Sequence, residues 1–250
     1  MDRMNALAAI VIAPFIGSFL AALAIRLPAG EPIALARSAC RSCGARLGPG
    51  SLVPVLSWLW LRGRCAACGA RIGAFYPVVE IAAVVLAAWA AAVVSGWLLW
   101  ASCALGWTLL ALAAIDWRTF TLPDPLSLPL IPAGLAVIAL IDPARLGGHA
   151  AGALIGFCAL AGLAYAYRAL RGRDGLGLGD AKLFAAAGAW VGWEGLASVL
   201  LIGAVAGLCG AAAGRCLGGT LSWSRRLAFG PYLALGFWVV WLHGPLAPAG

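Results

Sequence analysis

Long apolar runs separated by short polar segments make up most of the chain. Five runs are long enough to cross a bilayer as a helix, which takes about 20 residues; these are residues 4–25, 76–94, 97–115, 149–167 and 195–214. Shorter apolar runs cover residues 125–141, 181–193 and 228–243. The alternating segments of about ten residues that are typical of membrane β-barrels are absent. We therefore predict an all-α polytopic membrane protein with about eight transmembrane helices.

Proline and glycine positions predict where these helices deviate from regular geometry. Three prolines lie near the start of the run 125–141, so we expect an irregular start there. Residues 192–194, Gly-Trp-Glu, predict a turn between the two neighbouring apolar runs. Pro14 and the segment 17–20, Gly-Ser-Phe-Leu, predict a kink or close helix packing in the first run.

Residues 26–75 form a different kind of segment. They contain seven arginines, several Pro and Gly residues and two Cys-x-x-Cys pairs. This segment is long enough to fold outside the lipid. We therefore predict three parts: a first transmembrane helix at 1–25, a cytoplasmic zinc-binding domain at 26–75, and a transmembrane bundle at 76–250.

Composition and charge placement support a membrane protein and exclude a nucleic-acid partner. Hydrophobic residues make up 64% of the chain and charged residues only 10%, whereas about a quarter of residues are charged in soluble domains. The net charge is +8, but all of the 17 basic residues except Arg3 and Arg145 fall in one alternating set of loops. This is the positive-inside pattern. It predicts cytoplasmic placement of the 26–75 loop and outward termini. Because the first apolar run lacks a basic N-terminal region and a clear small-residue cleavage site, we predict that it is retained as a span.

The four cysteines of the 26–75 segment have the spacing of a metal site. The sequence Cys-x-x-Cys-Gly-Ala-Arg occurs twice, at Cys40/Cys43 and at Cys65/Cys68. Two such turns can place four thiolates around one Zn²⁺, and the following glycine permits the tight turn. Because four ligands leave no open position, we predict structural zinc. The alternative is a pair of disulfides or a redox dithiol, which a cytoplasmic location disfavours.

Two aspartates lie at the ends of apolar runs that we predict to meet at the cytoplasmic face. Asp116 ends the run 97–115, and Asp180 precedes the run 181–193. Taken singly, each is as compatible with an ion pair, Asp116 with Arg118 or Asp180 with Lys182, as with function. Two carboxylates brought close together cannot both ionise cheaply, so they share a proton and can act as general acid and base. Such a pair can activate water against a peptide carbonyl.

Other residues near these aspartates are candidates for supporting roles. Gly175, Gly177 and Gly179 remove side chains around Asp180, so an extended peptide backbone can approach. We interpret Asp124 as a helix cap or as a group that supports the catalytic pair, and we include Lys182 with it. At the cytoplasmic end of its run, Glu80 is expected to meet the arginines of the cysteine loop.

Other chemistries fit the sequence less well. His149 and His243 are both predicted on the opposite face from the aspartates, so a Ser-His or Cys-His mechanism lacks its base. The His-Glu-x-x-His pattern of zinc peptidases is absent. A proton-coupled transporter would need carboxylates near mid-membrane and inverted repeats, and neither pattern is present.

The motifs around the two aspartates and the four cysteines resemble those of a known family. Gly177-Leu178-Gly179-Asp180 is a GxGD motif, and Asp116 precedes the Leu-Pro-Asp of 122–124 at the spacing of that family. With residues 26–28 (Arg-Leu-Pro), 54–65, 76–80 (Tyr-Pro-Val-Val-Glu) and the paired cysteines, residues 15–245 resemble the bacterial prepilin peptidases, which are membrane aspartyl proteases of the GxGD type.

The resemblance implies a function and its site. Asp116 and Asp180 would be the catalytic pair, and Cys40, Cys43, Cys65 and Cys68 would bind zinc. The substrates would be type IV prepilins or type II secretion pseudopilins, cut at the cytoplasmic face of the bacterial inner membrane. Bifunctional members then methylate the new N-terminus with S-adenosylmethionine. The sequence assigns no residue to that cofactor and no oligomeric state.

One departure and one alternative accompany this interpretation. The family commonly has Asn after Gly-Ser-Phe-Leu, where this chain has Ala21. The departure bears on methylation and leaves proteolysis unaffected. The alternative function is a non-enzymatic factor for pilus or secretion assembly that docks through the zinc loop.

Overall fold

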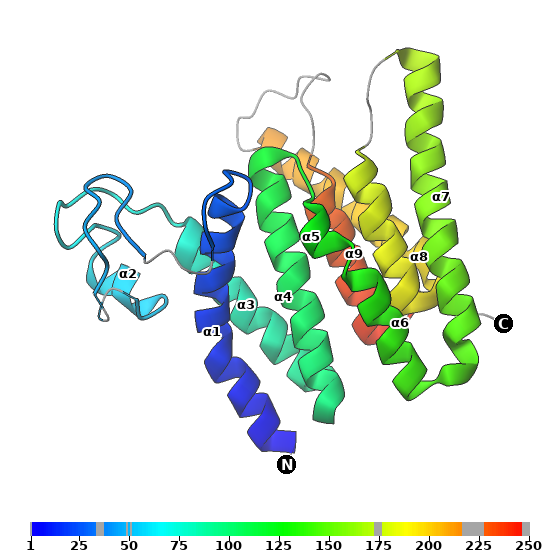
Figure 1. Cartoon of the computed structure of the whole chain (residues 1–250), viewed down its shortest axis with the longest axis horizontal. Helices are drawn as coiled ribbons and strands as arrows, with labels where there is room; N and C mark the ends of the chain where they lie inside the picture. The colour runs from blue at the N-terminus through cyan, green and yellow to red at the C-terminus, as the bar shows by residue number, and fades with distance from the viewer. Residues whose placement is uncertain are drawn as a thin grey trace. The chain divides into compact units, whose positions relative to one another are not determined.

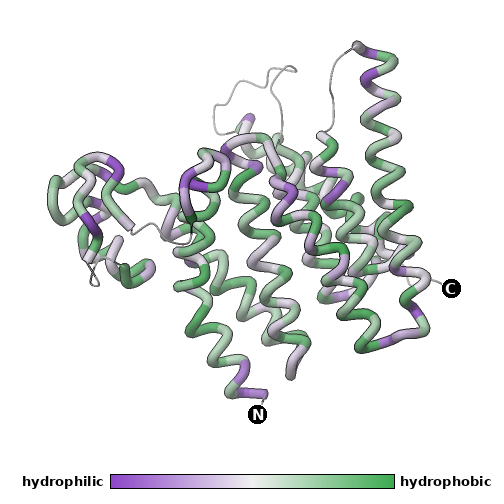
Figure 2. Tube along the Cα trace, viewed as in Figure 1, coloured by the Kyte–Doolittle hydropathy of each residue, from purple (hydrophilic) through white to green (hydrophobic). Residues whose placement is uncertain are grey.

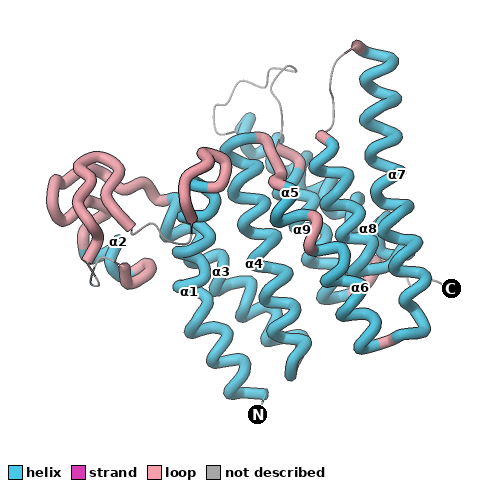
Figure 3. The backbone as a smooth tube through the Cα atoms, in the orientation of Figure 1, coloured by secondary structure: helices cyan, strands magenta, loops and turns pink. Residues whose placement is uncertain are grey.

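The structure is a computed structural model, and it describes residues 2–33, 38–48, 50, 52–172, 177–216 and 228–246. Gly175 therefore lies outside the described residues. Helices account for most of this part of the chain, and no strand longer than an isolated bridge occurs in it (Figures 1 and 3). The predicted all-α class is confirmed. The chain divides into two compact units, Met1–Ala114 and Ile115–Gly250, and the division falls inside helix α4 (Gly96–Thr119).

Six helices or helix pairs are long and apolar enough to span a membrane within the described residues. They are Asp2–Arg26, Phe75–Val93, Gly96–Thr119, Asp124–Ile141, Pro143–Arg171 and Leu178–Cys216. The colouring of Figure 2 shows how strongly hydrophobic residues dominate these helices. The count is lower than the eight predicted segments for two reasons. The runs 181–193 and 195–214 fall in one assigned helix, and the final helix has only 14 residues, which is about 21 Å of length.

In the first unit, α1 (Asp2–Arg26) packs closely against α3 (Phe75–Val93). The two helices approach at Gly17, where a Cβ atom would lie 2.6 Å from the Cα of Glu80. No side chain fits in that space, so glycine permits the contact. The predicted close packing of the segment 17–20 is confirmed.

Glu80 connects the membrane helix α3 to the cysteine segment. This residue is 5% exposed, and its Oε2 accepts the backbone N–H of Val55 at 2.7 Å. We expected arginines to meet this carboxylate, and the structure gives it this backbone donor. Val55 lies in the left-handed region with φ 59°, immediately before the short helix α2 (Leu56–Trp60). The hydrogen bond thus fixes a strained turn against the start of α3.

In the second unit, α8 (Leu178–Cys216) is the central helix. It packs against α7 (Leu146–Arg171), α6 (Leu130–Ile141) and α9 (Gly230–His243). Gly192, with φ 74° and ψ 172°, interrupts the helical geometry of α8, which confirms the predicted turn at 192–194.

The segment between α4 and α6 has the irregular start that its prolines predict. A single-turn helix, α5 (Asp124–Ser127), precedes α6, and a short turn separates the two. Phe120 has φ 55° and donates its N–H to the carbonyl of Asp116 at 2.9 Å. The chain therefore reverses direction at Phe120, one helical turn after Asp116. This reversal brings α5 back onto α8.

Candidate active site and metal centre

Asp116 lies near the C-terminal end of α4 and is buried, with 6% of its surface exposed. Its Oδ2 accepts the backbone N–H of Gly230 at 3.0 Å. Gly230 is the first residue of α9 and is itself buried. A buried carboxylate requires such donors because its desolvation is costly. The structure therefore fixes one oxygen of Asp116 by a residue that lies 114 positions later.

Asp180 lies in the first turn of α8 and is partly exposed. Its backbone N–H donates to the carbonyl of Gly177 at 3.1 Å. The positive end of the helix dipole stabilises a negative side chain at this position. Asp180 is close enough to Asp116 for the two charges to interact.

One pocket of about 260 Å³ contains both aspartates. Its lining residues are Asp116, Phe120, Thr121, Leu122, Asp124, Gly177, Gly179, Asp180 and Lys182. No histidine is among these lining residues. His149 instead contacts the carbonyl of Ala189 through Nδ1 at 3.2 Å, close to the break in α8 at Gly192. The pocket thus combines two carboxylates from α4 and α8 with polar groups that come from the loop and α5.

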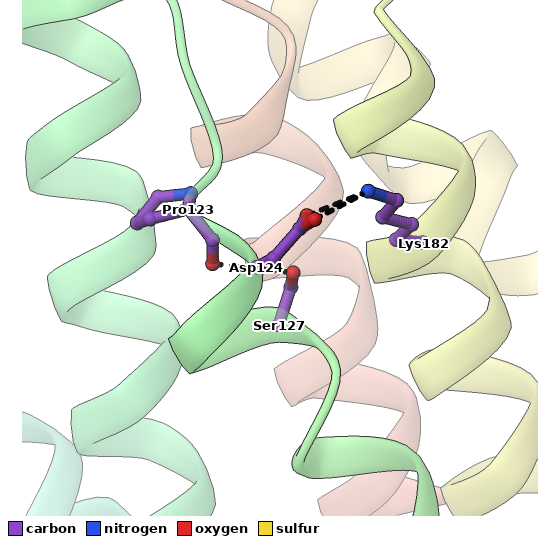
Figure 4. Close-up of polar contacts among 4 residues, drawn as sticks. All are labelled: Pro123, Asp124, Ser127 and Lys182. Atoms are coloured by element: carbon purple, nitrogen blue, oxygen red, sulfur yellow. Dashed lines mark hydrogen bonds and ion pairs between the residues drawn. The ribbon is translucent and has the colours of Figure 1, made fainter.

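Lys182 forms an ion pair with Asp124, as Figure 4 shows. The Nζ atom lies 2.6 Å from Oδ1 and 2.8 Å from Oδ2 of Asp124. The lysine therefore pairs with Asp124 and not with Asp180, which was the ion-pair partner considered from the sequence. Asp124 is the first residue of α5 and follows the N-cap residue Pro123, and both of its carboxylate oxygens accept from Lys182. Its interpretation as a helix cap is wrong, because the carboxylate is turned toward α8.

We expect Asp124→Asn to reduce the rate of substrate cleavage only severalfold. The ion pair is partly exposed, with 28% of the Lys182 side chain and 51% of the Asp124 side chain accessible. Such pairs contribute about 0–1 kcal/mol to stability, so the fold should tolerate the change. Thermal unfolding and cleavage rates measure the two effects. Complete loss of cleavage with an intact fold would contradict a supporting role and make Asp124 a catalytic group.

The two described glycines beside Asp180 differ in the space around them. A Cβ atom on Gly177 would lie 3.5 Å from Oδ2 of Asp180, which is an ordinary contact. A Cβ atom on Gly179 would lie 2.9 Å from the Cβ of Leu122, which is too close. Gly179 is thus required by packing within the unit, whereas Gly177 leaves the edge of the pocket open.

These contacts predict different kinetic effects for two matched substitutions. Gly179→Ala should displace Leu122 and lower kcat by about tenfold to a hundredfold, since small misplacements of catalytic groups are costly. Gly177→Ala should leave kcat and the melting temperature unchanged and raise KM about threefold to tenfold, if a peptide backbone passes this edge. Steady-state kinetics of both variants provide the measurement. Equal effects of the two substitutions would contradict the different roles that we assign to Gly179 in packing and to Gly177 at the pocket edge.

Sequence reasoning missed Gly230 and Leu122 as parts of this site. In the sequence, Leu122 is part of the Leu-Pro-Asp motif and Gly230 is part of the last apolar run. Neither pattern by itself indicates a role at the site. A usable signal for Gly230 is the pair Gly230-Pro231 at the start of a helix, because the first N–H groups of a helix lack partners within it. The sequence offers no indication of which carboxylate such a donor meets.

The four predicted cysteine ligands come together in the first unit. The Sγ atoms of Cys40, Cys43, Cys65 and Cys68 all lie within 4.8 Å of one another. Tetrahedral Zn²⁺ with Zn–S bonds of about 2.3 Å places its sulfurs about 3.8 Å apart, and Cys40 Sγ and Cys68 Sγ are 3.9 Å apart. The donor set and its dimensions therefore fit zinc.

Both cysteine turns have the same backbone structure. The N–H groups of Gly44 and Gly69 donate to the carbonyls of Cys40 and Cys65, each at 2.9 Å. Both glycines have positive φ angles, 71° and 70°, as the tight turn requires. An isolated antiparallel bridge closes each turn, Ala39 with Arg46 and Arg64 with Arg71. The repeated Cys-x-x-Cys-Gly-Ala-Arg sequence therefore folds into two equivalent turns, which bring the four sulfurs together.

The thiols differ in acidity, which is relevant to metal binding. The backbone N–H groups of Cys43 and Ser42 lower the pKa of the Cys40 thiol to about 6. The Ala70 N–H acts to lower the pKa of Cys68, but contacts with the other thiols and burial outweigh it and raise that pKa to about 11. Four thiolates this close repel one another, and a bound dication removes that repulsion.

Trp58 and Trp60 of α2, next to this cluster, have different surroundings. Trp58 donates its Nε1–H to the carbonyl of Ile72 at 3.0 Å and lies against Gly63. Trp60 is 88% exposed. One tryptophan therefore stabilises the cysteine segment internally, and the other is free at its surface.

The fold and these sites define a class of protein: a helical, multi-pass membrane protein with paired carboxylates in a pocket and a four-cysteine cluster. Comparison with known families agrees with this class. Residues 11–94 match the bacterial peptidase A24 N-terminal domain. Residues 103–212 match the type IV leader peptidase family.

Curated relatives give the same result. The chain is 42% identical over 214 residues to a "Prepilin leader peptidase/N-methyltransferase" of Burkholderia pseudomallei (strain 1026b), covering 84% of this chain and 68% of the relative. It is 40% identical to one from Aeromonas hydrophila, covering 83% and 72%, and 34% identical to one from Stutzerimonas stutzeri, covering 95% and 90%. The chain therefore belongs to the type IV leader peptidase family, which is a family of proteases. No solved structure matches it significantly.

Proposed function

We propose that this protein is an aspartic endopeptidase that removes the leader from type IV prepilins or type II secretion pseudopilins. The observation that carries this proposal is the shared pocket of Asp116 and Asp180. Relatives of which this chain covers 68% and 72% bear the name prepilin leader peptidase/N-methyltransferase, which supports the substrate class.

The chemistry follows from one shared proton. Of two interacting carboxylates, one is ionised and takes a proton from a water molecule, while the other is protonated and donates to the peptide carbonyl oxygen. The attacking water adds to the carbonyl carbon, and the departing amine then receives a proton from the pair. The pair titrates as a unit, so its pH profile belongs to both residues.

The orientation of the site is part of the proposal. The strong bias of Lys and Arg toward one set of loops supports a cytoplasmic location for the pocket and the cysteine segment. Multiple spans in the bacterial inner membrane would then present the pocket to a substrate at the point where its hydrophobic helix leaves the bilayer. Zinc at the four cysteines would stabilise the segment 26–75 and take no part in proteolysis, because all four positions of the metal are filled.

N-methylation is the second half of the name that the relatives bear. S-adenosylmethionine would supply the methyl group, and we assign no residue to its binding. The test of the proposal is incubation of the protein, reconstituted in nanodiscs, with a purified prepilin. Mass spectrometry should find the mature chain, and it should find one added methyl group in the presence of S-adenosylmethionine only if methylation is retained. An uncut prepilin would overturn the proposal.

A further inference from the structure

Helix α9 contacts Asp116, one member of the candidate catalytic pair, through its first residue. The N–H of Gly230 donates to Oδ2 of Asp116 at 3.0 Å, and both residues are buried. Gly230 lies beyond residue 212, where the match to the leader peptidase family ends. The contact therefore comes from a part of the chain to which the family match assigns nothing.

The first turn of α9 has one N–H group free for this contact. Pro231 has no N–H, and the N–H groups of Tyr232 and Leu233 already donate to the carbonyl of Phe229 at 3.1 and 3.0 Å. The Gly230 N–H is thus directed away from the helix, at its electropositive end. A carboxylate is the partner that this position favours.

The absence of a side chain at position 230 is as important as the N–H group. A Cβ atom there would lie 2.7 Å from Oδ2 and 3.1 Å from Cγ of Asp116. It would also lie 3.2 Å from Cδ2 of Leu122. The carboxylate therefore occupies the space that any other residue would fill.

We propose that Gly230 is a positioning residue of the peptidase, which fixes the Asp116 carboxylate in the pocket that it shares with Asp180. The inference rests on the proposed function of that pair. The N–H restricts rotation of the carboxylate and favours its ionised form, because it donates to the negative charge. The other charged groups that line the pocket are Asp124 and Lys182, and they bind each other.

The test is Gly230→Ala in the full-length protein, assayed on a prepilin in nanodiscs. A displaced carboxylate should lower kcat about tenfold to a hundredfold, as expected for the loss of a hydrogen bond to a charged group. KM should change less than about threefold, since Gly230 does not line the pocket. The acidic limb of the kcat/KM profile should move to higher pH, because the ionised carboxylate loses a donor.

Two further glycines provide matched controls for steric damage. Gly236→Ala, in the same helix, would place a Cβ against the backbone of Val199 and disturb the α8–α9 contact without reaching Asp116. It should lower the melting temperature and leave the pH profile of the folded enzyme unchanged. Gly162→Ala, on an open face of α7, should change neither.

The outcomes separate this inference from the proposed function. A wild-type kcat and pH profile in Gly230→Ala, beside an inactive Asp116→Ala, would overturn the positioning role alone. A shift of the pH profile in Gly236→Ala as large as that in Gly230→Ala would also overturn the positioning role alone. Normal cleavage by Asp116→Ala would overturn the proposed function and the positioning role together.

Discussion

Replacing Asp116 or Asp180 is expected to abolish leader cleavage while leaving the protein folded. General acid–base catalysis by a positioned side chain contributes about a hundredfold to ten-thousandfold to a rate. Because the two carboxylates act as a unit, losing either should cost at least about a thousandfold. Asp116→Asn retains an acceptor oxygen for the Gly230 N–H, and Asp180 is partly exposed. Neither site should therefore lose its packing.

The measurement is cleavage of a purified prepilin by Asp116→Ala, Asp180→Ala and the two Asn variants, together with thermal unfolding of each. Asp142→Asn is the control, because this aspartate pairs with Arg145 on the surface and does not line the pocket. It should cleave at the wild-type rate. Full activity of Asp180→Ala would contradict the assignment of the catalytic pair.

Loss of zinc is expected to unfold the cysteine segment and to leave the aspartate pocket assembled. The described residues of the segment contain two isolated bridges and one helix of five residues, so the metal would provide much of the segment's stability. In small zinc-binding peptides the metal contributes about 10–16 kcal/mol. Cys43→Ser should therefore reduce bound zinc from about one ion per chain to nearly none. Acidification should release the ion too, because protons compete with the metal for the thiolates.

Metal analysis, together with limited proteolysis between residues 38 and 72, measures this effect. Cys158→Ser is the matched control, since Cys158 is exposed on α7 and outside the cluster. The same variants test the alternative function. A non-enzymatic assembly factor that docks through the zinc loop should suffer more from Cys43→Ser than from Asp180→Ala, whereas a peptidase should show the reverse order in leader cleavage.

The chain could be assigned to a structural class from its sequence because local properties determine that class. Long apolar runs must form helices in lipid, where each backbone polar group needs an internal partner. The prolines before α6 and the Gly-Trp-Glu turn in α8 also act locally, and both had the predicted effect. The repeated cysteine motif is equally local, since the turn that holds each pair of sulfurs is formed by five consecutive residues.

The partners of the charged groups were decided by tertiary packing. Lys182 is two residues from Asp180, yet it binds Asp124, because α5 folds back onto α8. Glu80 accepts an N–H from Val55, and Asp116 accepts one from Gly230. These contacts join residues 25 and 114 positions apart. The sequence by itself thus determined the helices, the two cysteine turns and the two candidate acids, because these depend on neighbouring residues. Which groups surround each acid depends on how the helices pack, and only the tertiary structure decided it.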